Sequence, residues 1–190
     1  MFSILGGEWR GRKLKAVERP GLRPTSSRVK ASIFNILDSI VLKKTGSTDF
    51  SGWRCADLYA GVGGLGLEML SRGAASCVFV EKDRTHAKVL LDNVSSLGCG
   101  DRCTVLVASV ESADWESMAP FDLVLIDPPY ASSELPGLLR RLVDRKLLSD
   151  EGIVLFEHGP DVTQGEISGL RLQSARTIGP AGISVYLRDA

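Results

Sequence analysis

Residues 54–66 read Arg54-Cys55-Ala56-Asp57-Leu58-Tyr59-Ala60-Gly61-Val62-Gly63-Gly64-Leu65-Gly66, and this stretch decides the fold class. A short apolar strand, Arg54–Leu58, runs into a glycine-rich turn, and the turn opens a helix. The spacing Gly61-x-Gly63-x-x-Gly66 lets the backbone turn sharply and approach a ligand closely. The same spacing also occurs in tight strand-to-helix turns that bind nothing, so on its own it is a weak sign of nucleotide binding.

Apolar strands alternate with helical patterns from residue 54 onward, which is typical of a mostly parallel sheet with helices on both faces. We expect an α/β fold of Rossmann-like type with seven strands, the last two paired as an antiparallel hairpin around Gly179–Gly182. The expected strands are Arg54–Leu58, Ser76–Val80, Cys103–Val107, Asp122–Ile126, Gly152–Glu157, Leu170–Thr177 and Ile183–Leu187. The expected helices are Arg28–Leu42, Leu65–Arg72, Arg84–Leu97 and Glu134–Leu148, with a loop at Lys43–Gly52.

A second motif, Asp127-Pro128-Pro129-Tyr130, follows the apolar run of the fourth strand. The prolines cannot donate ladder hydrogen bonds and they fix φ, so the strand must stop in a stiff turn. In open α/β sheets the carboxyl ends of strands are where ligands bind. The Asp127 carboxylate and the Pro128 carbonyl can accept N–H bonds while the Tyr130 ring stacks. The turn therefore suits a flat heterocycle with an exocyclic amine.

The acidic residues near the glycine turn bear on the choice of cofactor. Glu81 follows the next strand, where it can accept bonds from ribose hydroxyls, as in a nicotinamide dinucleotide or S-adenosylmethionine. Asp57 would repel a pyrophosphate but suits the ammonium group of a methionine moiety. The histidines His86 and His158 form no set for hydride transfer. S-adenosylmethionine is the better fit.

Charge is distributed unevenly along a chain whose formal net charge is zero. Residues 1–30 carry eight Lys/Arg against two Glu, a net charge of +6, so the remainder carries −6. A basic arm on an acidic body suggests a polyanionic partner, although a merely solvated segment has the same composition. The four cysteines lack C-x-x-C spacing, so we expect no metal site and a reduced, cytoplasmic setting. No apolar run is long enough to span a membrane, and no signal peptide is expected.

Further segments carry a resemblance to a known family: Gly6–Leu14, Gly21–Thr25, Arg28–Lys30 and Phe34-Asn35. With the glycine turn, Glu81 and the Asp-Pro-Pro-Tyr motif, they resemble the bacterial RsmD-like family over nearly the whole chain. That family uses S-adenosylmethionine to methylate N2 of a guanine in 16S ribosomal RNA. Two positions depart from the family pattern. Ser109 stands where Asp or Asn usually meets the adenine ring, and His158 follows Glu157 where a serine is common.

The resemblance assigns roles to individual residues. It implies a basic N-terminal extension at 1–25, forming a small RNA-contacting hairpin, and a methyltransferase domain at 26–190. The catalytic residues would be Asp127, Pro128, Pro129 and Tyr130. S-adenosylmethionine would be bound by Asp57, Tyr59, Ala60, Gly61, Gly63, Gly66, Glu81, Lys82, Ser109 and Asp127. RNA phosphates would be bound by Arg10, Arg12, Lys13, Arg23 and Arg28.

The expected partner is 16S ribosomal RNA, within the small ribosomal subunit or an assembly intermediate, with no obligate protein partner. Two other functions remain open at this stage. A DNA methyltransferase acting on adenine N6 or cytosine N4 shares the same turn, although the chain has little room for a separate recognition domain. A non-catalytic binding protein on the same scaffold would not need residues 127–130. Methylation of cytosine C5 is not expected, because no cysteine stands in a suitable motif.

Overall fold

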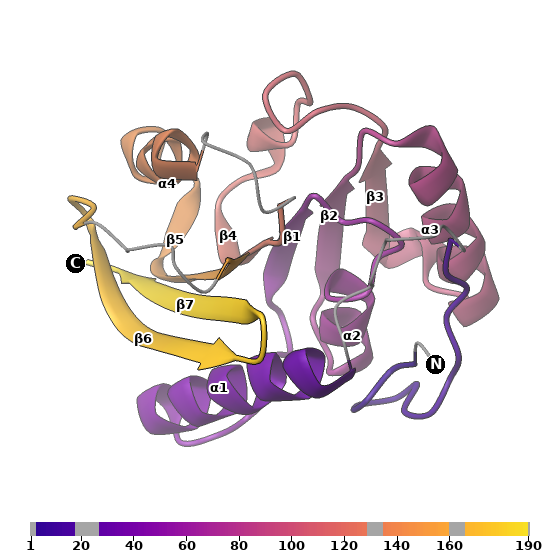
Figure 1. Ribbon diagram of the computed structural model, residues 1–190, viewed down its shortest axis with the longest axis horizontal. Coiled ribbons are helices and arrows are strands. Elements are labelled where there is room, and N and C mark those ends of the chain that lie inside the picture. Colours follow the sequence, from indigo (N-terminus) through magenta and orange to yellow (C-terminus); the bar gives the residue numbers. More distant parts are fainter. Residues whose placement is uncertain (1–2, 18–26, 129–134, 160–165, 190) are drawn as a thin grey trace.

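The computed structural model describes residues 3–17, 27–128, 135–159 and 166–189, and it contains one seven-stranded sheet in the order β3-β2-β1-β4-β5-β7-β6 (Figure 1). The first five of these strands are parallel, and β7 is antiparallel to both of its neighbours. The order reverses between β1 and β4, so the two halves of the sheet meet there. Such a switch point leaves a crevice at the carboxyl ends of the strands, where open α/β sheets bind ligands.

The strands agree closely with those predicted. They are β1 (Arg54–Leu58), β2 (Ser76–Val80), β3 (Cys103–Leu106), β4 (Phe121–Ile126), β5 (Leu148–His158), β6 (Leu170–Ile178) and β7 (Ala181–Arg188). The prediction for β5 was too short, because that strand begins at Leu148 and its pairing with β4 shifts register before Ile153. The prediction for β3 was one residue too long, since Val107 lies beyond the strand and is exposed.

The helices are α1 (Ser27–Thr45), α2 (Gly66–Ser71), α3 (Arg84–Leu97) and α4 (Leu135–Asp144), with short 3₁₀ turns at Gly100–Arg102 and Glu116–Met118. Helix α1 runs into the predicted loop and ends at Gly46, whose positive φ suits a helix terminus. Helix α4 ends earlier than predicted. Lys146 adopts a left-handed conformation there, and Leu147 donates back to Leu142 O. Within the described ranges, no helix combines the length and hydropathy needed to cross a membrane.

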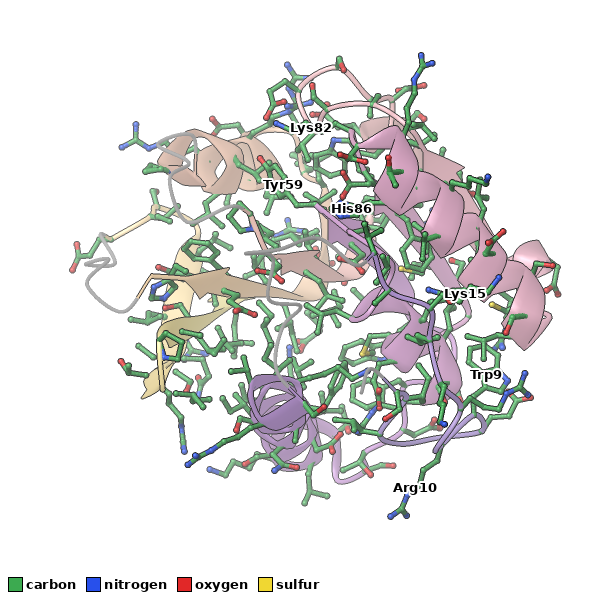
Figure 2. The ribbon with its side chains drawn as sticks, turned by 45° about the vertical axis from the view of Figure 1, so that its right-hand side comes forward. Trp9, Arg10, Lys15, Tyr59, Lys82 and His86 are labelled. Carbon is green, nitrogen blue, oxygen red and sulfur yellow. The ribbon has the colours of Figure 1, made fainter. Side chains whose placement is uncertain are left out.

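The N-terminal segment, residues 3–17, folds back on itself and packs against the body (Figure 2). An antiparallel bridge joins Ser3 to Lys13, and Ile4 N donates to Arg12 O at 3.0 Å. The side chains of Ile4, Trp9 and Leu14 are buried. The backbone also approaches α2 closely, since Glu8 N donates to the carbonyl of Ser71 at 2.7 Å. Residues 3–17 of the basic segment are therefore packed against the hydrophobic core and do not form a free arm.

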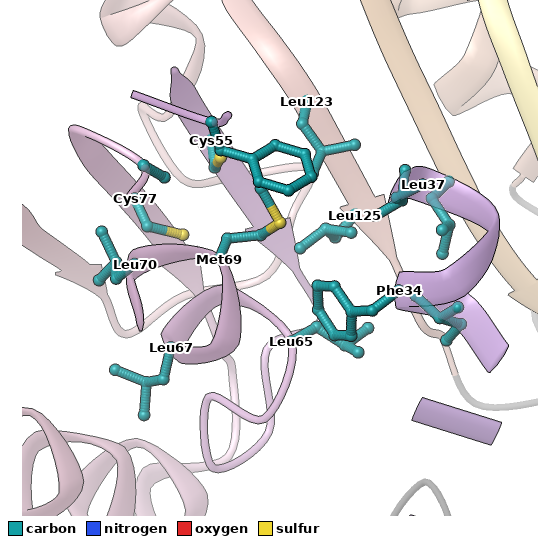
Figure 3. Close-up of a cluster of buried hydrophobic side chains, with 14 of the residues drawn as sticks. Phe34, Leu37, Cys55, Leu65, Leu67, Met69, Leu70, Cys77, Leu123 and Leu125 are labelled. Carbon is teal, nitrogen blue, oxygen red and sulfur yellow. The ribbon is translucent and has the colours of Figure 1, made fainter. Parts of the chain in front are cut away.

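Two apolar layers cover the faces of the sheet. Helices α1, α2 and α3 and the N-terminal segment pack on one face, where Phe34, Met69 and Leu125 meet (Figure 3). Helix α4 and the segment around Trp115 pack on the other. Successive side chains along a strand point to opposite faces of the sheet. Because both faces are covered, the side chains of the central strands are buried on both sides. Figure 1 shows α1 and α4 on opposite sides of the sheet.

Gly66 is the first residue of α2, and a side chain there has no room. An added Cβ would lie 2.4 Å from Phe79 Cε1 and 2.8 Å from Cys77 Sγ. We expect Gly66→Ala to lower the free energy of unfolding by about 1–3 kcal/mol through overpacking, as measured by urea denaturation. Gly137, in α4, is the matched control because its Cβ would meet nothing within 4 Å. Gly137→Ala should be neutral or stabilise by up to about 1 kcal/mol. Equal effects of the two substitutions would contradict this account.

Candidate active site

The carboxyl ends of β1, β2 and β4 are followed by Tyr59, Glu81 and Asp127. The backbone joins these ends to one another. Ala60 N donates to Val80 O at 3.0 Å, and Asp127 N lies 3.4 Å from Leu58 O. The described candidates Tyr59, Glu81 and Asp127 therefore follow strand ends that meet at the switch point between β1 and β4. This is the only place in the sheet where strand order reverses within its parallel part.

The glycine turn leaves β1 in an unusual backbone conformation. Tyr59 has a φ of 67°, which is rare for a residue with a bulky side chain and is a recognised feature of ligand-binding turns. Gly61 also has a positive φ, and a Cβ on it would meet nothing within 4 Å. Gly63 is different, because its Cβ would lie 2.4 Å from Leu90 Cδ1. Gly61 therefore keeps an open approach to the turn, whereas Gly63 lets the turn pack closely against α3 and Gly66 lets α2 pack closely against β2.

Glu81 joins the glycine turn to the start of α3 through its two carboxylate oxygens. Its Oε2 accepts from Gly61 N at 2.7 Å, and its Oε1 accepts from Asp83 N at 2.7 Å. The side chain is buried, so these bonds fix its orientation. Each carboxylate oxygen can accept a second hydrogen bond, which leaves acceptor capacity for a ribose hydroxyl. Asp83 in turn caps α3 by accepting from Thr85 N at 2.7 Å.

Asp57 closes the other end of the turn. Its Oδ2 accepts from Gly66 N, the first residue of α2, at 2.8 Å. Burial raises the pKa of Asp57 to about 7; the Gly66 N–H bond opposes this rise, and the negative charges of Asp127 and Glu81 add to it. The sequence interpretation of Asp57 considered only a cofactor ammonium. The structure adds a bond within the turn itself, which positions the carboxylate before any ligand arrives.

The described part of the Asp-Pro-Pro-Tyr motif is Asp127 and Pro128. Asp127 is half-buried and Pro128 is buried, while Pro129 and Tyr130 lie outside the described residues. The neighbouring strand contributes a carboxylate that the sequence interpretation did not include in the site. Ile126 pairs in register with Phe156, so Glu157, near the end of β5, lies at the position next to Asp127. Glu157 is only 3% exposed, and a charged residue ending an apolar strand was the signal for it.

His158 and Ser109 are the two residues that were expected to depart from the family pattern. The His158 ring is buried, with Nε2 2.9 Å from Ser184 Oγ and Nδ1 2.7 Å from Gly159 O. It is thus held by β7. Ser109 is half-buried in the turn after β3, with its Oγ 3.0 Å from Ser112 Oγ. Lys82, on the edge of the site, is exposed, and Figure 2 shows it at the same end of the molecule as Tyr59.

The five basic residues predicted to bind RNA do not form one uniform group. Arg10 and Lys13 are exposed on the N-terminal segment, and Arg10 projects away from the body (Figure 2). Arg12 is bound to α3, since its Nη2 donates to Ser96 O at 2.8 Å. Arg28 is exposed at the start of α1, and Arg23 lies outside the described residues.

The chain is similar to known proteins over almost its whole length. The model of the family described as Conserved hypothetical protein 95 matches residues 2–187. The Escherichia coli (strain K12) protein named Ribosomal RNA small subunit methyltransferase D is 36% identical over 154 residues, covering 81% of this chain and 73% of the relative. YlbH of Bacillus subtilis (strain 168) is 33% identical over 187 residues, covering 96% and 97% of the two chains.

A solved structure shares the fold at comparable identity. The protein yhhF from Escherichia coli has a TM-score of 0.78 and 32% identity, and the likeness covers 99% of this chain and 98% of that one. The methyl donor of the family is S-adenosylmethionine, in agreement with the cofactor expected from Glu81 and Asp57. The chain belongs to the RsmD family of methyltransferases, whose family model is described as Conserved hypothetical protein 95.

Proposed function

We propose that the chain transfers a methyl group from S-adenosylmethionine to the exocyclic N2 amine of a guanine in small-subunit ribosomal RNA. The observation that carries the proposal is the position of Asp127. Its carboxylate follows β4 at the switch point, and its backbone N–H lies against the end of β1, from which the glycine turn begins. An amine held by Asp127 would therefore lie beside a cofactor bound on that turn. The Escherichia coli relative named Ribosomal RNA small subunit methyltransferase D supports the same class of substrate.

The reaction needs orientation more than it needs a covalent intermediate. The lone pair of an aromatic amine is delocalised into the ring, so the amine is a weak nucleophile. Asp127 and the Pro128 carbonyl would accept its N–H bonds and hold the nitrogen in line with the sulfonium methyl group. A nitrogen–carbon bond would form as the sulfur–carbon bond of the donor breaks, and one amine proton would pass to the Asp127 carboxylate. Positioning, and negative charge beside a nitrogen that becomes cationic, would lower the barrier.

The position of Glu157 favours guanine over the other bases as the substrate. The Watson–Crick edge of guanine presents two neighbouring donors, N1–H and the N2 amine, whereas adenine and cytosine present only one beside an acceptor. Two carboxylates at the ends of adjacent strands, Asp127 and Glu157, match a pair of donors. They would repel the ring nitrogen acceptor of adenine or cytosine. Tyr130 would stack on the extruded base, which is worth about 1–3 kcal/mol and offsets the cost of unstacking.

The remaining site residues would hold the cofactor. Glu81 would accept from the ribose hydroxyls, and Asp57 would accept from the methionine ammonium. The Ser109 hydroxyl would reach the adenine amine from the turn after β3. Residues Tyr59, Ala60, Gly61, Gly63, Gly66 and Lys82 would line the same cofactor site.

The exposed cations of the N-terminal segment would bind RNA phosphates. Arg10, Lys13 and Arg28 are exposed, and we assign the phosphate contacts mainly to them. Arg12 would contribute less, because its guanidinium already binds α3. The substrate would be 16S ribosomal RNA in the small subunit or its assembly intermediate, and the site of action would be the cytoplasm.

Asp127→Ala should lower turnover by about 10²–10⁴-fold, because the amine loses its orienting acceptor. Calorimetry with S-adenosylmethionine should show a much smaller loss of affinity, because the other cofactor residues remain in place. Asp122→Asn is the matched control: Asp122 lies on the same strand at the opposite end, and an asparagine can still accept from Arg54 N. Full turnover in Asp127→Ala would refute the assignment. Mass analysis of nucleosides should find N2-methylguanosine, and a methylated adenosine would overturn the base assignment alone.

Replacing Arg10 and Lys13 together by glutamine should weaken RNA binding and reduce its dependence on salt. Each lost phosphate contact should lower the slope of log K against log salt by about 0.7–0.9. The measurement is a fluorescence titration of small-subunit RNA at several salt concentrations. Lys43→Gln, an exposed cation at the far end of α1, is the control and should leave the slope unchanged. An unaltered slope in the double variant would count against the N-terminal segment.

The raised pKa of Asp57 predicts a pH dependence of cofactor affinity. Below pH 7 the cofactor-free protein holds Asp57 largely protonated, whereas a cofactor ammonium favours the carboxylate, so binding releases a proton. Affinity for S-adenosylmethionine should therefore rise between about pH 5.5 and 7, by at most about tenfold per pH unit. Calorimetry at several pH values measures this affinity. Asp57→Asn retains an acceptor for Gly66 N–H and should bind more weakly without this slope. A slope that persists in that variant would exclude Asp57 as its source.

A further inference from the structure

Asn93 joins the N-terminal segment to the glycine turn. It lies on the buried face of α3 and is 1% exposed. Its Nδ2 donates to Val62 O at 3.0 Å and to Lys15 O at 3.1 Å, and its Oδ1 accepts from Lys15 N at 2.8 Å. Both donors and the acceptor of this amide are thus used on backbone groups of two separate segments. An apolar or acidic side chain of the same size would leave the carbonyls of Val62 and Lys15, both at part-buried hydrogen bonds, without this donor.

Lys30 makes a second link of the same kind from α1. Its side chain is 1% exposed, and its Nζ donates to Ser3 O at 2.8 Å and to Gly64 O at 3.3 Å. The ammonium group also forms an ion pair with Glu68 Oε2 at 2.9 Å. Burial lowers the pKa of Lys30, and Glu68 opposes that shift. Lys30 and Asn93 therefore bind opposite ends of the N-terminal segment, near Ser3 and near Lys15 respectively.

Both links end on the part of the turn that surrounds Gly63. Val62 O belongs to the peptide unit that enters Gly63, and Gly64 O belongs to the unit between Gly64 and Leu65. Because a peptide unit is planar, a carbonyl held in one direction also fixes the direction of the following N–H. Gly63 cannot relax independently, since it packs against Leu90 and its N–H donates to Ala60 O at 2.8 Å. The conformation of the turn is thus set from outside the turn.

We propose that Asn93 and Lys30 are positioning residues through which the N-terminal segment sets the geometry of the glycine turn, so that cofactor affinity depends on that segment being docked. The coupling is reciprocal by thermodynamic linkage: a ligand that steadies the segment tightens cofactor binding, and bound cofactor steadies the segment. The inference rests on the cofactor of the family and not on the proposed RNA substrate. Its test therefore does not depend on which base is methylated.

The test compares two neighbouring residues on α3 that differ in burial. Asn93→Asp keeps the size of the side chain and its acceptor for Lys15 N, but it removes the donors to Val62 O and Lys15 O. Asp92→Asn replaces a carboxylate by an amide at a half-exposed position. It breaks only the surface ion pair with Lys15. The dissociation constant of S-adenosylhomocysteine is measured by calorimetry, well below the melting temperature of each variant. We expect it to rise about tenfold or more in Asn93→Asp and to stay unchanged in Asp92→Asn.

The readout separates positioning from simple loss of stability, because a folded but less stable variant keeps its affinity at low temperature. Unchanged affinity in folded Asn93→Asp would overturn the proposal, and so would equal weakening in Asp92→Asn. Should Asn93→Asp fail to fold, Lys15 decides the question. Lys15→Pro removes the N–H that donates to Asn93, whereas Lys15→Ala removes only the exposed side chain. Weaker binding in the proline variant alone supports the proposal, and equal binding in both refutes it.

Discussion

A buried ion pair between Lys30 and Glu68 joins four parts of the chain, and the arrangement of the site depends on it. Glu68 is fully buried on α2; its carboxylate accepts from Leu5 N at 2.8 Å and Gly6 N at 2.7 Å, and it also binds Arg72. Taking both charges out of water is costly, and only complete hydrogen bonding offsets that cost. Here each charged group has several partners. The N-terminal segment can therefore dock in only one register, because any shift would leave one of these charges buried without its bonds.

That constraint places the basic segment and the glycine turn in one packed unit. Strand order alone would bring the ends of β1, β2 and β4 together, as in any sheet of this topology. It would not determine where cations lie relative to the crevice. The docked segment does so, because Trp9 and Leu14 are buried while Arg10 and Lys13 remain exposed. Cofactor and polyanion would thus be held by two surfaces of the same small region, with Asn93 between them.

The sequence predicted the central strands well because each is a short apolar run bounded by polar or glycine residues. β1 and β2 have the predicted bounds, and the hairpin of β6 and β7 closes the edge as expected. The helix ends were less predictable. The leucines at 147 and 148 continue the spacing of α4, yet the left-handed conformation of Lys146 ends the helical course, and Leu148 begins β5. Lys30 and Asn93 could not be identified from periodicity, since polar residues on amphipathic helices normally face solvent. Only the tertiary contacts show that these two face inward.

The acidic character of the crevice has a consequence for the order of events in catalysis. Asp57 and Glu157 lie near the carboxyl ends of β1 and β5, and Glu81 and Asp127 follow the adjacent strands β2 and β4. Burial raises the pKa of Asp57, and repulsion from the negative charges of Asp127 and Glu81 raises it further. A cofactor with a sulfonium and an ammonium group relieves that repulsion. Once the methyl group has left, the sulfur is neutral, and one of the two positive charges is gone. The same carboxylates then stabilise the product less than they stabilised the donor. An acidic crevice therefore favours binding of the methyl donor and release of the spent cofactor, which a neutral site of the same shape would not do.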